Sequence, residues 1–211
     1  MVSSLAMATP TPCALPSATY NTYNPQALGT LTGSVTCTIN NLTFSEFQFA
    51  SSSTGGATLP VPSDITVTPQ TTLGNEGFIF SENFVNQDAT LSFLVTAAPG
   101  TTISDLSIFL NSASNGGSAN FTETYCTAAF TGPSCQTFAA GDLFGTFSKE
   151  IDIAPVPKLY ITKDFGVTGN ATFSTVGNNY SNVPEPSQLG MLLVGMGGLF
   201  FARRKANASA Q

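Results

Sequence analysis

The chain has 211 residues, of which 42% are hydrophobic and only 9% are charged, and it contains no histidine or tryptophan. This hydrophobic content excludes a disordered chain, and its length allows one domain of about 165 residues with a self-sufficient core. Without histidine, a Ser-His-Asp triad, a Cys-His pair and a histidine metal site are excluded. The net charge is −6. Residues 1–183 contain only three lysines and no arginine, which argues against nucleic-acid binding by this part of the chain, because such binding needs clusters of lysine and arginine.

Residues 1–12 are expected to be a signal-peptide remnant or a disordered N-terminus. They lack a basic segment and an apolar stretch of seven or more residues, which a complete secretory signal contains. Ala6-Met7-Ala8 has the small-x-small pattern that signal peptidase cleaves. We therefore hypothesise that the natural start lies upstream, with a flexible polar N-terminus as the alternative.

The four cysteines form an even set: Cys13, Cys37, Cys126 and Cys135. An even number in an exported domain indicates two disulfides, for which three pairings are possible. Proximity in sequence favours Cys13 with Cys37 and Cys126 with Cys135. Zinc binding is the weaker alternative, because the chain has neither a CxxC spacing nor a histidine.

Alternation of apolar and polar residues predicts short strands between the cysteines and beyond them. The clearest examples are Leu91-x-Phe93-x-Val95 and Leu106-x-Ile108-x-Leu110. The phase changes between Leu42 and Phe49, which predicts a β-bulge near Ser45-Glu46. Other alternating positions are Ile65 and Val67, Phe78 and Phe80, Phe121, Glu123 and Tyr125, Leu159 and Ile161, and Ala171 and Phe173.

Segments rich in Gly, Asn, Ser and Pro separate these strands and predict loops, notably at 69–77 and 111–117. No stretch before Leu189 has a convincing helical period, and no internal repeat indicates a solenoid. The expected fold class is therefore all-β: an antiparallel, jelly-roll-like β-sandwich over residues 13–182, followed by a short hydrophobic C-terminal helix.

Catalytic residues are sparse in this pattern. Two carboxylates could hydrolyse a glycoside, and the candidates are Glu46, Glu76, Glu82, Asp88 and Glu123, but their spacing selects no pair. Asp88 and Asp142 are possible calcium ligands without an EF-hand pattern around them, so solvated loop acids are the better interpretation. We expect no enzymatic activity, cofactor or metal.

Two kinds of binding surface were weighed. A carbohydrate-binding module would present exposed aromatic side chains, for which the tyrosines are candidates; the absence of tryptophan weighs against strong sugar stacking. An ice-binding face would need regularly spaced threonines, and no T-x-T repeat recurs at a fixed period. The candidate tyrosines are Tyr20, Tyr23, Tyr125, Tyr160 and Tyr180.

The C-terminal segment has three consecutive parts. Pro184-Glu185-Pro186 is held extended because each proline fixes its own φ and disfavours helix before it. The uncharged run 189–202 would span roughly 21 Å as a helix, short of a hydrocarbon core of about 30 Å, so it suits transient membrane retention. Its retention residues are Leu189, Leu192, Leu193, Val194, Leu199, Phe200 and Phe201. Arg203, Arg204 and Lys205 form a basic anchor that favours the cytoplasmic side.

These three parts in this order resemble the PEP-CTERM protein-sorting signal, over residues 183–205 only; residues 206–211 form a short uncharged tail. The resemblance implies delivery to the inner membrane, processing near the proline-flanked glutamate by an exosortase-type protease, and release to the cell surface or an exopolysaccharide matrix. The same type of signal occurs on some ice-binding proteins. A buried core helix followed by a basic tail is the alternative for this segment.

Together these observations predict an exported surface or extracellular-matrix protein with a non-catalytic structural or adhesive role. The alternatives are a secreted carbohydrate-binding or ice-binding module and a glycoside hydrolase that uses two carboxylates.

Overall fold

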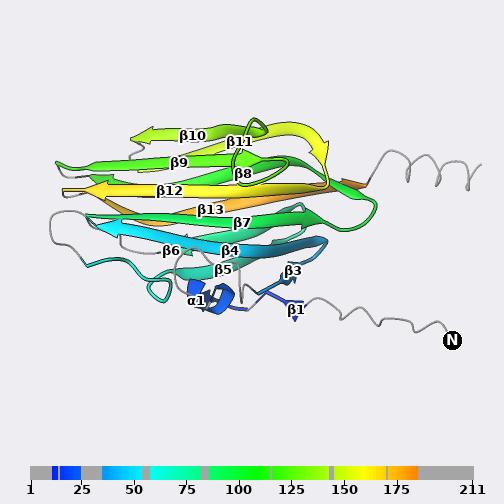
Figure 1. The fold of residues 1–211 in the computed structure, drawn as a ribbon, viewed down its shortest axis with the longest axis horizontal. Coiled ribbons are helices and arrows are strands. Elements are labelled where there is room, and N and C mark those ends of the chain that lie inside the picture. Colours follow the sequence, from blue (N-terminus) through cyan, green and yellow to red (C-terminus); the bar gives the residue numbers. More distant parts are fainter. Residues whose placement is uncertain are drawn as a thin grey trace, which may run out of the picture.

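The computed structural model describes residues 11–13, 15–24, 35–53, 58–81, 86–114, 116–142, 145–169 and 171–184. Within these residues the chain is almost entirely β-strand, with one short helix, α1 (Tyr20–Tyr23). The strands form two stacked sheets (Figure 1), one of seven strands and one of six. The predicted all-β sandwich is confirmed, while its jelly-roll character stays a prediction.

The seven-stranded sheet has the order β1-β3-β4-β7-β12-β9-β10. All its ladders are antiparallel except the short parallel pairing of β1 with β3. Its strands are β1 (Thr11–Pro12), β3 (Cys37–Ile39), β4 (Leu42–Ser53), β7 (Gln87–Ala97), β9 (Ser118–Cys126), β10 (Cys135–Asp142) and β12 (Lys158–Thr168).

The six-stranded sheet has the order β11-β8-β13-β6-β5-β2, and its ladders are antiparallel. β12 and β13 follow each other in the chain but belong to different sheets, so side chains from both meet in the interior. The strands are β2 (Ala18–Thr19), β5 (Thr66–Thr72), β6 (Asn75–Ser81), β8 (Thr101–Ser114), β11 (Gly145–Val156) and β13 (Ala171–Pro184).

Aromatic rings fill the interior at the end of the sandwich near α1. Phe78 of β6 lies 4.6 Å from Phe44 and 6.1 Å from Phe93, measured between ring centroids. Tyr20 and Tyr23 of α1 are buried against the same group. Edge-to-face contacts of this kind add to the free energy gained by burying the rings.

The predicted bulge in β4 is confirmed. Ser45 pairs with Leu94 and Gln48 pairs with Ser92, so β4 contains one more residue than β7 at this point. Glu46 has a φ of 55°, in the left-handed region. The extra residue shifts the alternation, and Phe44 and Phe47 are both buried as a result.

Two predicted loops are wrong in extent, because pairing extends the strands into residues with low strand propensity. β8 continues to Ser114 because it pairs with β11 on one side and with β13 on the other. β5 includes Pro69, which pairs with Phe78 of β6 on one side. On its other side β5 pairs with β2 only at Thr66 and Val67, so Pro69 lies on an unpaired edge. Proline is tolerated there because the missing N–H removes no bond on an unpaired edge.

Two strands, β10 and β11, were not identified from the pattern. In β11 the row that faces inward is Phe147, Lys149 and Ile151, according to its register with β8. Lys149 interrupts the apolar alternation, but its Nζ donates a hydrogen bond of 2.6 Å to the carbonyl of Phe138 in β10. The lysine therefore connects the edge strands of the two sheets.

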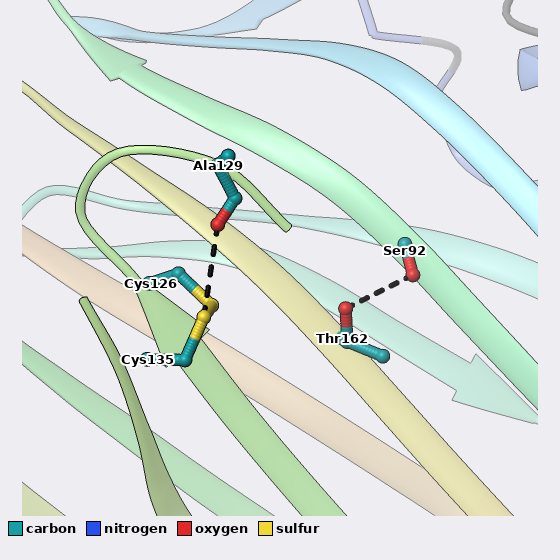
Figure 2. The surroundings of a disulfide bond; sticks show 5 residues. All are labelled: Ser92, Cys126, Ala129, Cys135 and Thr162. Carbon is teal, nitrogen blue, oxygen red and sulfur yellow. Dashed lines mark hydrogen bonds between the residues drawn. A yellow bond between two sulfur atoms is a disulfide. The ribbon is translucent and has the colours of Figure 1, made fainter. Parts of the chain in front are cut away.

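The disulfides are Cys13–Cys37 and Cys126–Cys135, which confirms the pairing favoured by proximity. Figure 2 shows Cys126–Cys135 joining opposed residues at the end of the β9–β10 ladder, near the 3.1 Å hydrogen bond between the hydroxyls of Ser92 and Thr162. Cys13–Cys37 joins β3 to the residue that follows β1. The β1–β3 ladder itself is short and contains only two residue pairs.

We predict that removing Cys13–Cys37 destabilises the protein more than removing Cys126–Cys135. Loop entropy gives about 3.5 kcal/mol for the first and about 2.7 kcal/mol for the second, and the longer β9–β10 ladder holds its strands without the bond. Urea unfolding of Cys13→Ser/Cys37→Ser beside Cys126→Ser/Cys135→Ser measures both values. Equal stability of the two variants, or the reverse order, contradicts the prediction.

Candidate functional site

A lysine and a glutamate face the interior of the sandwich from neighbouring strands. Lys163 of β12 and Glu123 of β9 are directly opposed in the ladder. Lys163 lies in the inward row between Ile161 and Phe165, and Glu123 lies in the inward row next to Phe121. The alternation that buries the apolar residues therefore also buries this pair.

The two side chains form a salt bridge of 2.6 Å between Lys163 Nζ and Glu123 Oε2, and both are fully buried. Asn178 of β13, in the other sheet, donates from Nδ2 to Glu123 Oε1 at 2.5 Å and to the carbonyl of Ser107 at 3.3 Å. Each oxygen of the carboxylate thus binds one nitrogen, one from each sheet. We call Glu123, Lys163 and Asn178 the inter-sheet cluster.

Burial favours the neutral forms of the charged pair. Desolvation raises the pKa of Glu123 and lowers the pKa of Lys163, and the attraction between the two groups opposes both shifts. Nζ of Lys163 also lies 5.8 Å from the centroid of the Phe121 ring. The cluster therefore places an amine of reduced basicity beside a carboxyl of reduced acidity.

Two buried polar atoms next to the carboxyl have no hydrogen-bond partner among the described residues: Asn178 Oδ1 and the hydroxyl of Tyr180. Tyr180 follows Asn178 by two residues, so both lie on the inward face of β13. Burial and the nearby charge of Glu123 raise the pKa of Tyr180 well above its usual value. An unpaired buried polar atom costs about 1–3 kcal/mol, so these two atoms offset part of the free energy gained by burial around the cluster.

The other predicted carboxylates are dispersed. Glu76 is buried on β6 and accepts hydrogen bonds from Asn40 Nδ2 and the backbone of Gly74. Asp88 is partly exposed on β7, where burial and then the charge of Asp164 raise its pKa. Glu46 lies in the β4 bulge, and Glu82 lies outside the described residues. The described candidates therefore lie on four different strands, β4, β6, β7 and β9.

No group of three His, Cys, Asp or Glu side chains within the described ranges could hold a metal ion. The zinc alternative is wrong in this structure because all four cysteines are in disulfides.

The tyrosines considered for sugar stacking are mostly unavailable. Tyr20, Tyr23, Tyr125 and Tyr180 are buried. Tyr160 is half-buried, 5.0 Å from the Phe130 ring, and its hydroxyl accepts a hydrogen bond from Lys158 Nζ. Four of the five candidates therefore belong to the core.

A shallow depression of about 280 Å³ lies on β8 and β11, and sequence reasoning did not identify it. Phe109 lies against Gly177 of β13, since a β-carbon at residue 177 would come within 2.2 Å of a ring atom. The ring is half-buried and has polar groups on two sides. The depression is lined by Ser107, Ile108, Phe109, Ser148, Lys149 and Glu150.

The predicted sorting signal begins within the last strand. Val183 and Pro184 of β13 pair with Thr102 and Thr101 of β8. Glu185, Pro186, the retention residues from Leu189 to Phe201, and the basic anchor Arg203, Arg204 and Lys205 lie outside the described residues. Among the described residues, no helix is long and apolar enough to span a membrane.

Residues 182–206 match the profile of the PEP-CTERM protein-sorting motif. The chain carries this sorting signal. The match confirms the resemblance within one residue at each end, and it covers a limited part of the chain. The signal implies an exported surface protein.

Comparison of the whole chain adds no relative that decides the activity. No curated protein matches the sequence. Among solved structures, TmCBM61 in complex with beta-1,4-galactotriose has a TM-score of 0.36 at 13% identity, covering 65% of this chain and 88% of its own. The C-terminal CBM6 of LamC from Zobellia galactanivorans has a TM-score of 0.28 at 11% identity, covering 63% and 99%. The CBM22-1 xylan-binding domain of Paenibacillus barcinonensis Xyn10C has a TM-score of 0.26 at 13% identity, covering 84% and 97%. TM-scores this low carry no argument about the ligand of this chain.

Proposed function

We propose that this chain is a non-catalytic structural or adhesive protein of the bacterial cell surface or extracellular matrix. The observation that carries the proposal is the sorting signal at residues 182–206, which continues directly from the last strand of a disulfide-bonded β-sandwich. The sandwich is the part that remains outside the cell, and residues 13–182 are its proposed extent.

The physical properties of the tail define its role in delivery. The apolar run 189–202 holds the precursor at the inner membrane for a limited time, because it is shorter than a stable spanning helix. The cations after it keep the C-terminal end in the cytoplasm. An exosortase-type protease then recognises the Pro184-Glu185-Pro186 segment and releases the domain.

Several features support a role without catalysis. The chain contains no histidine, and Glu123, a fully buried candidate for glycoside hydrolysis, is paired with Lys163 inside the core. A substrate sugar would have to enter between the two sheets to reach it.

Truncation after Pro184 tests delivery without shortening β13. We predict that the truncated protein is exported and folded but is lost from the cell surface, because retention and processing need the residues that follow. Surface labelling and immunoblotting of cell, periplasmic and medium fractions measure this. Removing residues 207–211 alone, which lie beyond the matched signal, is the control and should leave delivery intact. Unchanged surface delivery of the truncated protein contradicts the proposal.

A second candidate function is polysaccharide binding at the depression on β8 and β11. It is favoured by the half-buried Phe109 ring, since an apolar ring bordered by polar groups suits the faces and hydroxyls of a sugar. The backbone of Gly177 holds this ring against the sheet. This surface gives the adhesive role a specific location.

Phe109→Ala tests the second function. We predict that retention of the purified protein on exopolysaccharide from the producing cells falls about tenfold, equivalent to about 1.4 kcal/mol. Leu73→Ala, which removes an exposed apolar side chain at the β5–β6 turn, is the matched control and should bind as the natural protein does. Equal retention of the two variants contradicts binding at this depression.

A further inference from the structure

The inter-sheet cluster contains the components of a covalent reaction. A lysine amine, a side-chain amide and a carboxyl group meet inside the core, with the carboxyl bonded to the amine at 2.6 Å and to the amide nitrogen at 2.5 Å. We propose that Lys163 and Asn178 form an intramolecular amide bond, with Glu123 transferring the protons, so that the two sheets are joined covalently.

The reaction is an exchange of one amide nitrogen for another. The lone pair of Lys163 Nζ attacks Cγ of Asn178, and Glu123 Oε2 accepts a proton from Nζ. Glu123 Oε1 gives a proton to Nδ2, the Cγ–Nδ2 bond breaks, and ammonia leaves. The product is a secondary amide between the two side chains, and Glu123 returns to its initial protonation state, so no oxidant or other reactant is consumed.

The positions of the donors suit this sequence of steps. Both oxygens of Glu123 accept hydrogen bonds in the unreacted structure, Oε2 from the amine and Oε1 from the amide nitrogen. Oε1 becomes the proton donor only after the attack, when Nδ2 has lost its amide resonance and can accept a proton. General acid–base catalysis requires both groups within hydrogen-bond distance, which holds here. Folding fixes all three side chains in place, and such positioning replaces a very high concentration of free reactants.

The environment supplies the required protonation states. A lysine amine is a nucleophile only when it is neutral, and desolvation in an apolar site favours that form. Burial lowers the pKa of Lys163 and raises the pKa of Glu123, so burial favours a neutral amine and a protonated carboxyl. Asn178 Oδ1 has no hydrogen-bond partner within the described residues, so the amide is held only through its nitrogen, by Glu123 and the Ser107 carbonyl.

The bond would connect positions that the disulfides leave independent. Both disulfides lie in the seven-stranded sheet, whereas Lys163 and Asn178 belong to different sheets. A covalent link between β12 and β13 would prevent the sheets from separating.

Mass spectrometry of the full-length folded protein tests the proposal. We expect the measured intact mass to be lower, by the mass of one ammonia, than the mass calculated from the sequence with both disulfides formed. The termini are identified in the same sample so that the calculated mass refers to the chain actually present. Chymotrypsin, which cleaves after Phe and Tyr, should release a linked pair of peptides, residues 161–165 joined to residues 174–180. The linked pair separates this reaction from ammonia loss at Asn115-Gly116, where a cyclic imide would leave the peptides unlinked.

Three variants assign the roles. Lys163→Arg and Glu123→Gln should both retain the full sequence mass, because one removes the nucleophile and the other removes the proton carrier. Lys158→Arg changes a lysine of the same strand outside the cluster and should keep the ammonia deficit. A full sequence mass for the folded natural protein overturns the proposal and leaves the cluster as a buried ion pair. An ammonia deficit without the linked peptides also overturns it, whether or not the variants fold.

Discussion

The interior of this sandwich contains a lysine and a glutamate at positions where the strand alternation calls for apolar side chains. Moving a lysine and a carboxylate out of water costs several kcal/mol per ion, and the cost is recovered only if both are closely paired and hydrogen bonded. Lys163 and Glu123 meet this condition through their 2.6 Å contact and through Asn178 of the opposite sheet. The stacking of the two sheets in this region therefore depends on the three side chains remaining together, because separation would leave unpaired charge in the core.

This constraint fits a protein that works outside the cell. A surface protein cannot rely on cellular chaperones or a reducing environment after delivery, and the disulfides at Cys13–Cys37 and Cys126–Cys135 restrict its unfolded chain. They act within one sheet, at the N-terminal strand and at the β9–β10 end. The inter-sheet cluster acts between the sheets. The sorting signal begins in β13, the same strand that supplies Asn178, so a single strand connects the interior of the domain to its delivery signal.

Much of the fold could be predicted because its strands obey local rules. The alternation at Leu91, Phe93 and Val95 predicts a strand, and the change of phase before Phe47 predicts the bulge. The sorting signal was predictable because its parts are contiguous. β11 could not be found in the same way, because Lys149 interrupts its inward row of apolar residues. The lysine is accommodated by a hydrogen bond to a carbonyl of β10, which belongs to the other sheet, and the sequence alone does not show this contact. The cluster could not be predicted for a related reason: the sequence places Glu123 on the same strand face as Phe121, but only tertiary pairing brings Lys163 and Asn178 to it.

The most direct test of the account compares the unfolding of Lys163→Met with that of Lys158→Met in urea. Both variants replace a lysine of β12 by an apolar side chain of similar length, but only Lys163 lies in the core. The account predicts that Lys163→Met loses at least about 3 kcal/mol of unfolding free energy, because Glu123 is left buried without its partner. Lys158→Met should unfold as the natural protein does. Equal stability of the two variants would contradict the claim that the buried cluster holds the sheets together.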